Sequence, residues 1–435
     1  MGSYEAVKVR LGPTPRQERL MASHAGAARF AYNAGLAHVK DALDSGEPAD
    51  WSHYGLRRWW NANKDELAVN QDTGEVWWSQ NSKEAYSMAL HGLARGLSNW
   101  AKSRKGRRKG KRVGFPKFKS KNTAMRFAYS TGFTAPKAGE PYGLKLPRIG
   151  RVHCMENVYR LVGGARLIRI TVSRRAGHWY ASLTVEREQS SSPAHTPKRG
   201  AVGVDLGVKR LATLSDGTVI PNPRALGARL KSLRKAHQAL SRKVKGSARR
   251  EKAKKHVARL HASVANVRAD AIHKATTMIA QNYSTVCVED LNVAGMVKNR
   301  HLSRSVSDAS LGEFRRRLEY KTARSGAVLR VVDRWFPSSK TCSNCGVVKA
   351  KLSLSERVFN CDACGLSLDR DVNAAINIEV AGSAPETLNA HGGTVRRGSL
   401  SGHVALVPVK CEPSGGESRV RLGAGLGDEA MQFRR

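Results

Sequence analysis

The spacing of apolar residues changes twice along the first 190 positions. Residues 4–11 alternate apolar and polar side chains, which predicts a strand, and Pro13 and Pro15 end that pattern. Residues 17–42 and 82–102 carry apolar side chains at intervals of three and four, which predicts two helices with one buried face each. The tryptophan-rich stretch between them completes a predicted small helical domain.

Strand-like patterns return between residues 123 and 186, where short alternating or β-branched runs are separated by glycines. The predicted strands are 143–147, 158–162, 167–172 and 179–185. Several short strands in succession predict a small β-barrel. The strand near residue 7 is a candidate to complete this barrel, which would make the helical domain an insertion.

From residue 201 onward, strand and helix patterns alternate, which predicts an α/β domain. A buried strand at 201–207 ends in a carboxylate and a glycine turn, and an apolar strand at 285–291 also runs into carboxylates. The other predicted elements are two short strands within 211–220, a helical hairpin within 226–279, a helix at 307–324, a strand at 328–332 and a helix from about residue 371. The Ser/Pro-rich stretch 190–198 is a predicted linker, and the Gly/Ser-rich stretch after residue 381 is a predicted disordered tail.

The net charge of the chain indicates what kind of partner it binds. The 435 residues carry a formal net charge of +40 and a pI near 10.6. Such an excess of Lys and Arg indicates a polyanionic partner, and nucleic acid is the usual one. No apolar run of about eighteen residues is present, so the sequence predicts no membrane partner. A chain of this length usually holds two or three domains.

Four cysteines follow the spacing Cys-x2-Cys-x15-Cys-x2-Cys: Cys342, Cys345, Cys361 and Cys364. Each Cys-x2-Cys pair offers two thiolates to one ion, and two pairs complete a tetrahedral site, so the spacing predicts a zinc ribbon. Two disulfides are the alternative, which the lack of a recognisable secretory signal disfavours. Cys154, Cys287 and Cys411 are scattered and are interpreted as ordinary thiols.

Three carboxylates stand at the ends of predicted elements. Asp205 and Glu289 close buried strands, and Asp371 opens a helix. Acids in these positions can point into one cleft and hold two Mg²⁺ ions about 4 Å apart, as in two-metal phosphodiester hydrolysis. The sequence therefore suggests a nuclease-type site. Because the three acids are far apart in the sequence, this site depends on the fold bringing them together.

Each acid has an alternative interpretation. Asp205 is able to cap the glycine turn that follows it, and Asp290 competes with Glu289 as a ligand. Asp371 is either a plain helix N-cap or yields its role to Asp369. We favour Asp371 because the Asn-Ala-Ala that follows starts a small-residue helix face able to pack closely on a sheet.

A basic run between residues 102 and 121 is broken by glycines and ends in Gly-Phe-Pro-Lys-Phe-Lys. Dense charge and glycines disfavour a helix, so we predict a flexible phosphate-binding loop, with a solvated surface loop as the alternative. Phe115 and Phe118 either stack on bases or pack on the core, and we favour the core. The predicted nucleic-acid contacts are Arg104, Lys105, Arg107, Arg108, Lys109, Lys111, Arg112, Lys117 and Lys119.

Several motifs occur together in one order: Gly-Val-Asp-Leu-Gly, Val-Glu-Asp-Leu-Asn, the four cysteines, and Asp-Arg-Asp-Val-Asn-Ala-Ala-Ile-Asn. Upstream stand Pro-Thr-Pro-Arg-Gln-Glu, Arg-Phe-Ala-Tyr-Asn and Gly-Phe-Pro-Lys-Phe-Lys. Together they resemble the TnpB proteins, RuvC-like nucleases that bacterial insertion sequences encode and that are related to compact type V CRISPR effectors. The resemblance covers about residues 4–381 and leaves out the tail.

This resemblance implies a multidomain α/β fold. It would combine a RuvC/RNase H-like nuclease domain, with an inserted zinc ribbon, and a small β-barrel wedge domain with an inserted helical recognition domain. The expected ranges are 1–14 and 122–190 for the wedge, 15–121 for the helical recognition domain with its basic loop, 191–199 for a linker, 200–381 for the nuclease domain, 338–368 for the zinc ribbon within it, and 382–435 for the tail.

The resemblance also implies an RNA-guided DNA endonuclease. A guide RNA made from the transposon end would pair with the target strand, and the protein would recognise a short motif beside the target. Asp205, Glu289 and Asp371 would be the catalytic, Mg²⁺-binding triad, and the four cysteines would hold one structural Zn²⁺. The expected partners are guide RNA and double-stranded target DNA in the bacterial cytosol. A monomer in the ribonucleoprotein is favoured, with a dimer left open.

Contacts to the target-adjacent motif would come from the helical domain and the wedge, and Asn33, Ser82 and Tyr86 are the candidates. Two other function classes remain open. A nuclease-dead RNA-guided repressor is disfavoured by the complete Asp/Glu/Asp set. A DNA-only resolvase or transposase would share the active-site pattern, and only RNA bound to the purified protein would separate it from a guided enzyme.

Overall fold

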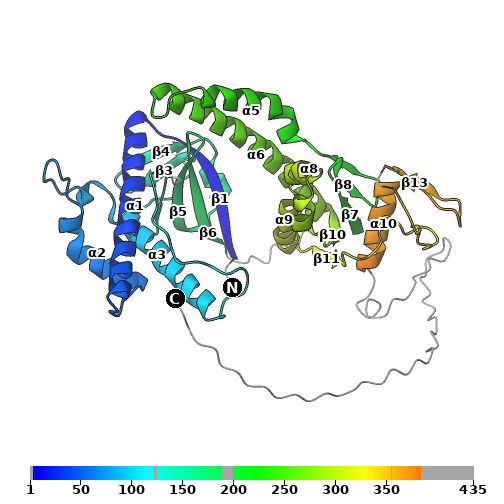
Figure 1. Ribbon diagram of the computed structural model, residues 1–435, viewed down its shortest axis with the longest axis horizontal. Coiled ribbons are helices and arrows are strands. Elements are labelled where there is room, and N and C mark those ends of the chain that lie inside the picture. The colour runs from blue at the N-terminus through cyan, green and yellow to red at the C-terminus, as the bar shows by residue number, and fades with distance from the viewer. Residues whose placement is uncertain (1–2, 122–124, 188–198, 354, 384–435) are drawn as a thin grey trace, which may run out of the picture. The chain divides into compact units, whose positions relative to one another are not determined.

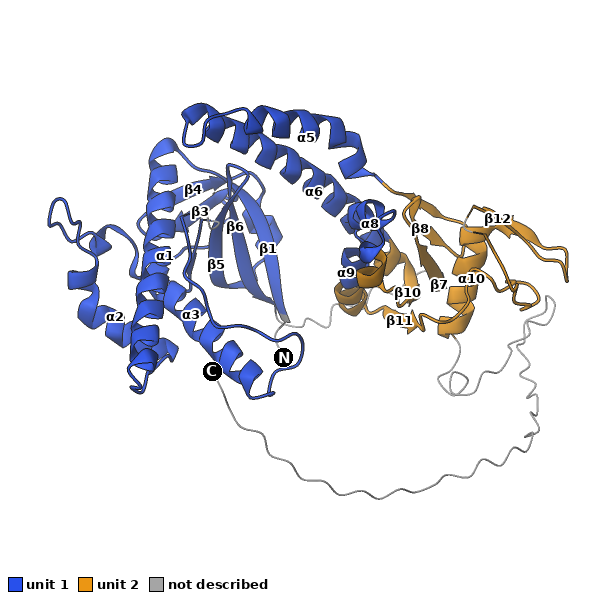
Figure 2. Cartoon of the chain, in the orientation of Figure 1, with its two compact units in different colours: residues 1–196, 223–278, 297–317 blue, residues 197–222, 279–296, 318–435 orange. Residues whose placement is uncertain are grey.

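The computed structural model describes residues 3–121, 125–187, 199–353 and 355–383. The predicted linker and tail therefore lie outside the described residues, except at their edges. The chain forms two compact units that interleave in sequence (Figure 2). Unit 1 comprises Met1–Thr196, Pro223–Met278 and Val297–Arg317, and unit 2 comprises Pro197–Asn222, Ile279–Met296 and Leu318–Arg435. The predicted domain boundaries stay predictions.

Unit 1 contains a six-stranded antiparallel sheet in the order β2-β5-β6-β1-β4-β3. The strands are β1 (Ser3–Gly12), β2 (Arg126–Tyr129), β3 (Gly143–Leu146), β4 (Gly150–Cys154), β5 (Arg166–Arg175) and β6 (His178–Arg187). The first strand pairs with β6 and β4, as the sequence predicts for a strand that completes this sheet (Figure 1). An isolated bridge joins Thr134, in the segment after β2, to Lys145 of β3.

One predicted strand is wrong. Residues 158–162 form the short helix α4 (Val158–Val162). The side chain of Asn157 accepts a hydrogen bond from the Arg160 amide at 2.8 Å, and Gly163 ends the helix in the left-handed conformation. These two cap signals are local, and they outweigh the strand preference of the valines, both of which are buried.

The helical part of unit 1 lies between β1 and β2 in the chain. It consists of α1 (Pro15–Asp44), α2 (His53–Leu67), the short 3₁₀ helix η1 (Trp78–Gln80) and α3 (Lys83–Arg104). A capping box between Thr14 and Gln17 starts α1, and Ser82 caps α3. The three α-helices enclose a core of aromatic and aliphatic side chains that includes Trp60, Tyr86 and Leu90.

The predicted helical hairpin is present as α5 (Ala225–Ser241) and α6 (Ala248–Asn282), followed by α7 (Val293–Lys298). The helix predicted at 307–324 is two helices, α8 (Ser303–Ala309) and α9 (Leu311–Ser325), because Ser310 adopts a left-handed conformation with φ of 55°. The buried carboxylate of Asp308 accepts a hydrogen bond from the Leu226 amide and pairs with Arg268, which fixes the start of α5.

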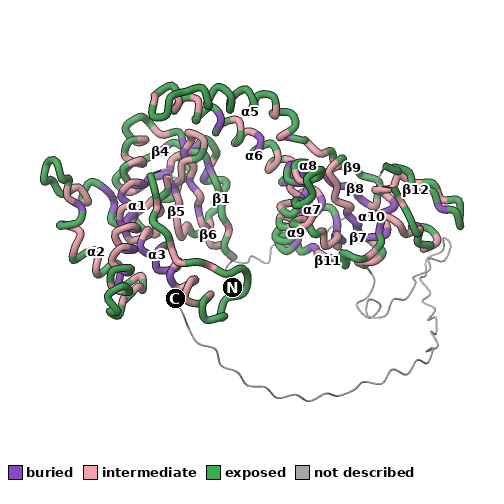
Figure 3. Tube along the Cα trace, in the orientation of Figure 1, coloured by how far each residue is buried: buried purple, intermediate pink, exposed green. Residues whose placement is uncertain are grey.

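Unit 2 is built on a five-stranded mixed sheet in the order β11-β10-β7-β8-β9. Its strands are β7 (Arg199–Leu206), β8 (Arg210–Leu214), β9 (Val219–Pro221), β10 (Tyr283–Glu289) and β11 (Val328–Val332). The pairs β7–β10 and β10–β11 are parallel. The hairpin of β12 (Val358–Asn360) and β13 (Ser367–Asp369) leads into α10 (Arg370–Ser383), where buried residues gather (Figure 3). No helix in the described part of the chain is long and apolar enough to span a membrane.

Candidate active site

Asp205 and Glu289 occupy matching positions on neighbouring strands. The parallel pair β7–β10 places Val204 opposite Val288, and each of these residues is followed directly by one of the acids. Parallel strands lie about 4.8 Å apart and side chains alternate between the two faces of the sheet. The two carboxylates therefore leave the same edge of the sheet side by side and on one face.

Helix α10 covers that face. A Cβ added to Gly203 would overlap the carbonyl oxygen of Ala375 and lie 2.6 Å from the Glu379 amide nitrogen. Farther along the helix, a Cβ added to Gly382 would lie 2.5 Å from the Cys287 sulfur. Because residues two apart on a strand share a face, Asp205 faces α10 with Gly203, and Glu289 faces it with Cys287.

Asp371 joins the two strand acids from the first turn of α10. Its neighbour Asp369 caps the helix, since the Asp369 carboxylate accepts hydrogen bonds from the amides of Asp371 and Val372 at 3.0 and 3.3 Å. Asp369 also accepts two hydrogen bonds from Arg210 at 2.9 Å, whereas Arg210 lies 3.7 Å from the Asp371 carboxylate. Asp369 therefore makes the capping contacts, and Asp371 stays the candidate ligand from this helix.

The acids at this edge of the sheet influence one another's protonation. Burial raises the pKa of Asp205 to about 7, and the negative charges of Glu289, Asp371 and, to a smaller extent, Asp369 contribute to that rise, with Arg370 opposing. Burial also raises the pKa of Glu289, against a hydrogen bond from the Ser338 hydroxyl. Carboxylates that destabilise one another's charge in a strongly basic protein favour binding of a cation.

The rival acid directly after β10 has another partner. Asp290 pairs with Arg334, while the side chain of Glu289 faces Ser338 and α10. The acids fit hard divalent ions such as Mg²⁺, which bind carboxylate oxygens. The four cysteines are the one group of His, Cys, Asp or Glu, among the described residues, whose ligand atoms all lie within 4.8 Å of one another. The carboxylate oxygens are spaced more widely than that.

The four cysteines form two matching turns. The amide of Cys342 donates to the Val347 carbonyl and that of Cys361 donates to the Leu366 carbonyl, both within 2.9 Å. In each turn the residue after the second cysteine is a glycine with positive φ, Gly346 or Gly365, which a side chain would strain.

The sulfur spacing suits a tetrahedral ion. The Cys342–Cys364 and Cys345–Cys361 sulfurs lie 3.6 and 3.5 Å apart. A Zn–S bond of ~2.3 Å gives a tetrahedron edge of about 3.8 Å, whereas a disulfide needs about 2.05 Å. All four are free thiols. The sulfurs thus form the predicted cluster and not the alternative disulfides.

Two buried asparagines of α10 hold the cysteine cluster. The Asn373 side chain accepts from the Ser343 amide at 2.9 Å and donates to the Thr341 carbonyl at 2.8 Å. The Asn377 side chain donates to the carbonyls of Ser338 and Thr341 at 2.8 and 2.7 Å. The helix that presents Asp371 is therefore hydrogen-bonded to the first cysteine turn.

These contacts were not foreseen from the sequence, although a signal was present. Asn373 and Asn377 lie four residues apart, so they share one face of a helix that starts at the candidate acid. Gly203 carried a similar signal as a glycine in the middle of a buried strand, which often marks close approach of another backbone. Arg210 and Ser338 gave no sequence signal of their roles.

The basic loop has no helix or strand from Lys105 to Lys121, as predicted, and it is held at both ends. The Val113 amide donates to the Ser103 hydroxyl, and Asn33 and Lys119 exchange two hydrogen bonds at 2.8 and 3.0 Å. Eight of its nine candidate contact residues are exposed. The exception is Lys119, whose pKa is lowered to about 8 by burial and by the charge of Arg126.

The aromatic residues of the loop differ from each other. Phe115 packs against the helical core and meets Trp100 edge-on at 4.9 Å between ring centroids, as predicted. Phe118 is instead exposed, with the Lys40 ammonium 5.4 Å from its ring centroid. The core prediction is therefore correct for Phe115 and wrong for Phe118.

The three candidates for target-adjacent-motif contacts have structural partners within the helical part. Asn33 binds Lys119, and the Ser82 hydroxyl caps α3. The Tyr86 hydroxyl donates to the Trp78 carbonyl at 2.9 Å, and burial raises its pKa to about 12. These contacts account for the three polar groups without DNA, so the DNA-contact role stays a prediction.

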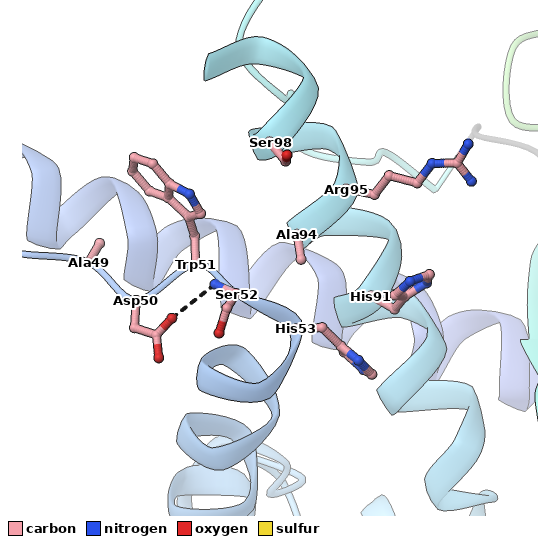
Figure 4. Close-up of a pocket in the computed structure, with 9 residues that line it drawn as sticks. All are labelled: Ala49, Asp50, Trp51, Ser52, His53, His91, Ala94, Arg95 and Ser98. Atoms are coloured by element: carbon pink, nitrogen blue, oxygen red, sulfur yellow. Dashed lines mark hydrogen bonds between the residues drawn. The ribbon is translucent and has the colours of Figure 1, made fainter. Parts of the chain in front are cut away.

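A cavity of about 480 Å³ opens between α3 and the segment before α2 (Figure 4). The rings of His53 and His91 meet edge-on at 5.0 Å across it, and Arg95 lies on the same face of α3 as His91. Burial and the charges of His53, Arg169 and Arg95 lower the pKa of His91. The cavity belongs to the helical part of unit 1.

Several known proteins are similar to this chain in sequence, two of them over most of its length. The chain is 40% identical over 419 residues to a "Putative RNA-guided DNA endonuclease" of Mycobacterium tuberculosis, covering 91% of this chain and 90% of the relative. It is 33% identical to the "Putative RNA-guided DNA endonuclease InsQ" of Escherichia coli K12, over 88% and 94% of the two chains. A "TnpB-like protein" of Acanthamoeba polyphaga mimivirus is 31% identical over 32% of this chain and 27% of its own. The chain belongs to the TnpB family.

Three family descriptions match parts of this TnpB chain. They are "Probable transposase" at residues 182–300, "Cas12f1-like, TNB domain" at 312–378 and "Helix-turn-helix domain" at 1–47. The second range spans the four cysteines, Ser338 and Asp371. Within the third, the described residues form a strand and one long helix, β1 and α1.

Proposed function

We propose that this chain is an RNA-guided DNA endonuclease of the TnpB type, cleaving target DNA beside a short target-adjacent motif. The observation that supports it most is the convergence of Asp205, Glu289 and Asp371 at one end of the α10-covered sheet face. Two family members that are 40% and 33% identical carry the name RNA-guided DNA endonuclease, qualified as "putative". The reaction proposed is hydrolysis of a phosphodiester bond.

The residues divide the chemistry between them. Asp205 and Glu289 offer carboxylate oxygens from a rigid sheet, and Asp371 offers a third from the helix above it. Two Mg²⁺ ions held there would activate a water molecule and stabilise the leaving oxygen. Ser338 fixes the Glu289 carboxylate by hydrogen bonding, and Arg210 pairs with the Asp369 carboxylate that caps α10. Asn373 and Asn377 keep the start of α10 in place.

We assign one structural Zn²⁺ to the four cysteines. The ion would lock the two turns, and the hydrogen bonds from Asn373 to Ser343 and Thr341 would transmit that rigidity to α10. Loss of zinc would loosen the segment that presents Asp371, since a structural zinc site contributes directly to local folding.

Nucleic-acid binding is assigned to unit 1. The six-stranded sheet would act as the wedge and helices α1 to α3 as the recognition domain, with the basic loop contacting phosphates. The net charge of +40 suits binding of both guide RNA and target DNA. The proposed working form is a monomer with its guide RNA in the bacterial cytosol.

The test uses the protein purified with its bound RNA. Sequencing that RNA should give one species of defined length, from which a matching target can be designed. Plasmids carrying the target beside randomised flanking bases should be cut in Mg²⁺ and left intact in EDTA. Purified protein that lacks RNA and still cuts DNA would favour the DNA-only class. Guided binding without cutting would favour the repressor class.

A further inference from the structure

Trp335 is the most exposed large apolar side chain among the described residues, at 84% of its full surface. It lies in unit 2, in the short segment that follows β11. The whole indole is therefore open to a partner, and a Trp ring offers a large, flat apolar contact area to one.

Both ends of the loop that carries Trp335 contact Glu289 or its strand. At one end, Val332 pairs with Glu289 across the parallel strands β10 and β11. At the other end, the Ser338 hydroxyl donates to the Glu289 carboxylate. Trp335 is three residues from each end, which limits it to about 10 Å of chain from Val332 and from Ser338, the two residues next to the candidate catalytic acid.

The loop is held in one conformation around the exposed ring. The Trp335 amide donates to the Asp333 carboxylate at 2.8 Å, and the Phe336 amide donates to the Asp333 carbonyl at 3.1 Å. Arg334 pairs with Asp290, and Phe336 packs on the core beside Cys287. The neighbours on both sides are therefore anchored, while the indole itself is almost fully exposed.

We propose that the Trp335 indole stacks on an unpaired base of the DNA strand that enters the acid cluster, next to the bond to be cut. This inference rests on the proposed nuclease function and adds a substrate-positioning residue to it. Every base has a flat π face, so stacking holds a single strand without selecting its sequence. The role requires a single-stranded stretch at the active site, which guided strand separation would supply.

The first experiment detects stacking without cleavage. An Asp205→Ala ribonucleoprotein is mixed with target DNA carrying 2-aminopurine at one position at a time around the cut site. Stacking on an indole should quench the fluorescence at one position. The quenching should disappear in Asp205→Ala/Trp335→Ala and be partly kept in Asp205→Ala/Trp335→Phe. Equal fluorescence at every position with and without Trp335 would overturn the proposal.

The second experiment measures cleavage with an intact triad. Trp335→Ala should weaken use of the target, seen as a roughly 5- to 150-fold rise in KM, and Trp335→Phe should restore most of it. An abasic site at the quenched position should slow cleavage by the wild-type protein. The same abasic site should slow cleavage by Trp335→Ala very little further, because the substitution and the abasic site remove the same interaction. Tyr320→Ala, a second exposed aromatic of unit 2, serves as the control.

The outcomes separate this proposal from the nuclease assignment. Full cleavage by Asp205→Ala would refute the assignment of the active site. Cleavage that depends on Asp205 but is the same for wild type and Trp335→Ala, on intact and abasic targets, would refute stacking alone. If Trp335 instead contacted another protein, its substitution would alter binding to that protein. The abasic site would then slow cleavage by Trp335→Ala as much as it slows cleavage by the wild type.

Discussion

Gly203 of β7 lies against the backbone of Ala375 in α10, so closely that a methyl group on Gly203 would overlap the Ala375 carbonyl oxygen. This close approach sets the height of the helix above the strand that carries Asp205. Because the obstacle is backbone and not a flexible side chain, Gly203→Ala should lower the free energy of unfolding by about 1–3 kcal/mol. The cleavage rate should fall further than this loss of stability alone would explain, because α10, which carries Asp371, must move away from β7.

Gly200 provides the matched control for this change. It lies on the same strand, and a Cβ there meets nothing within 4 Å. Gly200→Ala should therefore leave both the unfolding midpoint and the cleavage rate near wild-type values. Equal effects from the two substitutions would show that the helix does not rest on Gly203.

Substitutions at Asp371 and at Asp369 should have different effects on cleavage. Asp371→Ala should abolish cleavage while leaving guided DNA binding largely intact, because binding rests on many phosphate contacts and base pairs. Asp369→Asn keeps an oxygen able to cap α10 and should retain measurable cleavage. Cleavage and filter-binding assays on both variants check this, and normal cutting by Asp371→Ala would transfer the ligand role to Asp369.

Elemental analysis should find one Zn²⁺ per chain. Cys342→Ser should lower the zinc content and slow cleavage, because the first cysteine turn is hydrogen-bonded to Asn373. Cys154→Ala removes a buried thiol from the unit 1 sheet and should keep full zinc. A wild-type protein that lacks zinc and cuts normally would contradict the assignment.

Neutralising Arg107, Arg108, Lys109 and Lys111 together should weaken nucleic-acid binding to a similar degree for different guide and target sequences, since phosphate contacts do not read bases. The slope of log K against log salt should flatten by about 0.7 to 0.9 for each phosphate that is no longer neutralised. A control that exchanges Lys for Arg and Arg for Lys at the four positions keeps the charge and should keep the slope. An unchanged slope in the neutral variant would show that the loop contacts no phosphate and would support the alternative, a solvated surface loop.

The stability of unit 1 should fall as the pH drops below about 6.5, the usual pKa of histidine. His24 is fully buried, with Nδ1 bonded to the Leu20 carbonyl at 2.8 Å and Nε2 accepting from the Ser82 amide at 3.1 Å. Burial lowers its pKa, so the unfolded chain binds a proton that the folded chain refuses. Thermal unfolding from pH 7 to 5 should show a smaller loss in His24→Gln than in the wild type. Exposed His261→Gln should behave as the wild type does.

Sequence reasoning succeeded where a signal is local. The cysteine turns are specified by spacing and by the glycine after each pair, so the cluster could be predicted without the fold. The two strand acids were singled out for a related reason, since Asp205 and Glu289 each follow a buried apolar run, and their catalytic role stays a prediction. Their convergence depends on the strand register, which the sequence did not contain explicitly.

Other features depend on tertiary contacts. The choice of Asp371 over Asp369 needs the position of Arg210, which comes from a strand far away in the chain. The helix at 158–162 needed its caps at Asn157 and Gly163 to be weighed above β-branched composition. The exposure of Trp335 could not be predicted, because an aromatic residue after a strand is usually buried.

The order of the elements along the chain has a consequence for protein synthesis. Both strand acids and all the basic surfaces of unit 1 emerge from the ribosome before α10, which is made last among the described elements. A growing chain, or a product shortened before residue 370, therefore lacks the third acid and the helix that covers Gly203 and Cys287. Such a product would retain the charge to occupy nucleic acid without the means to cut it, and would compete with the finished enzyme.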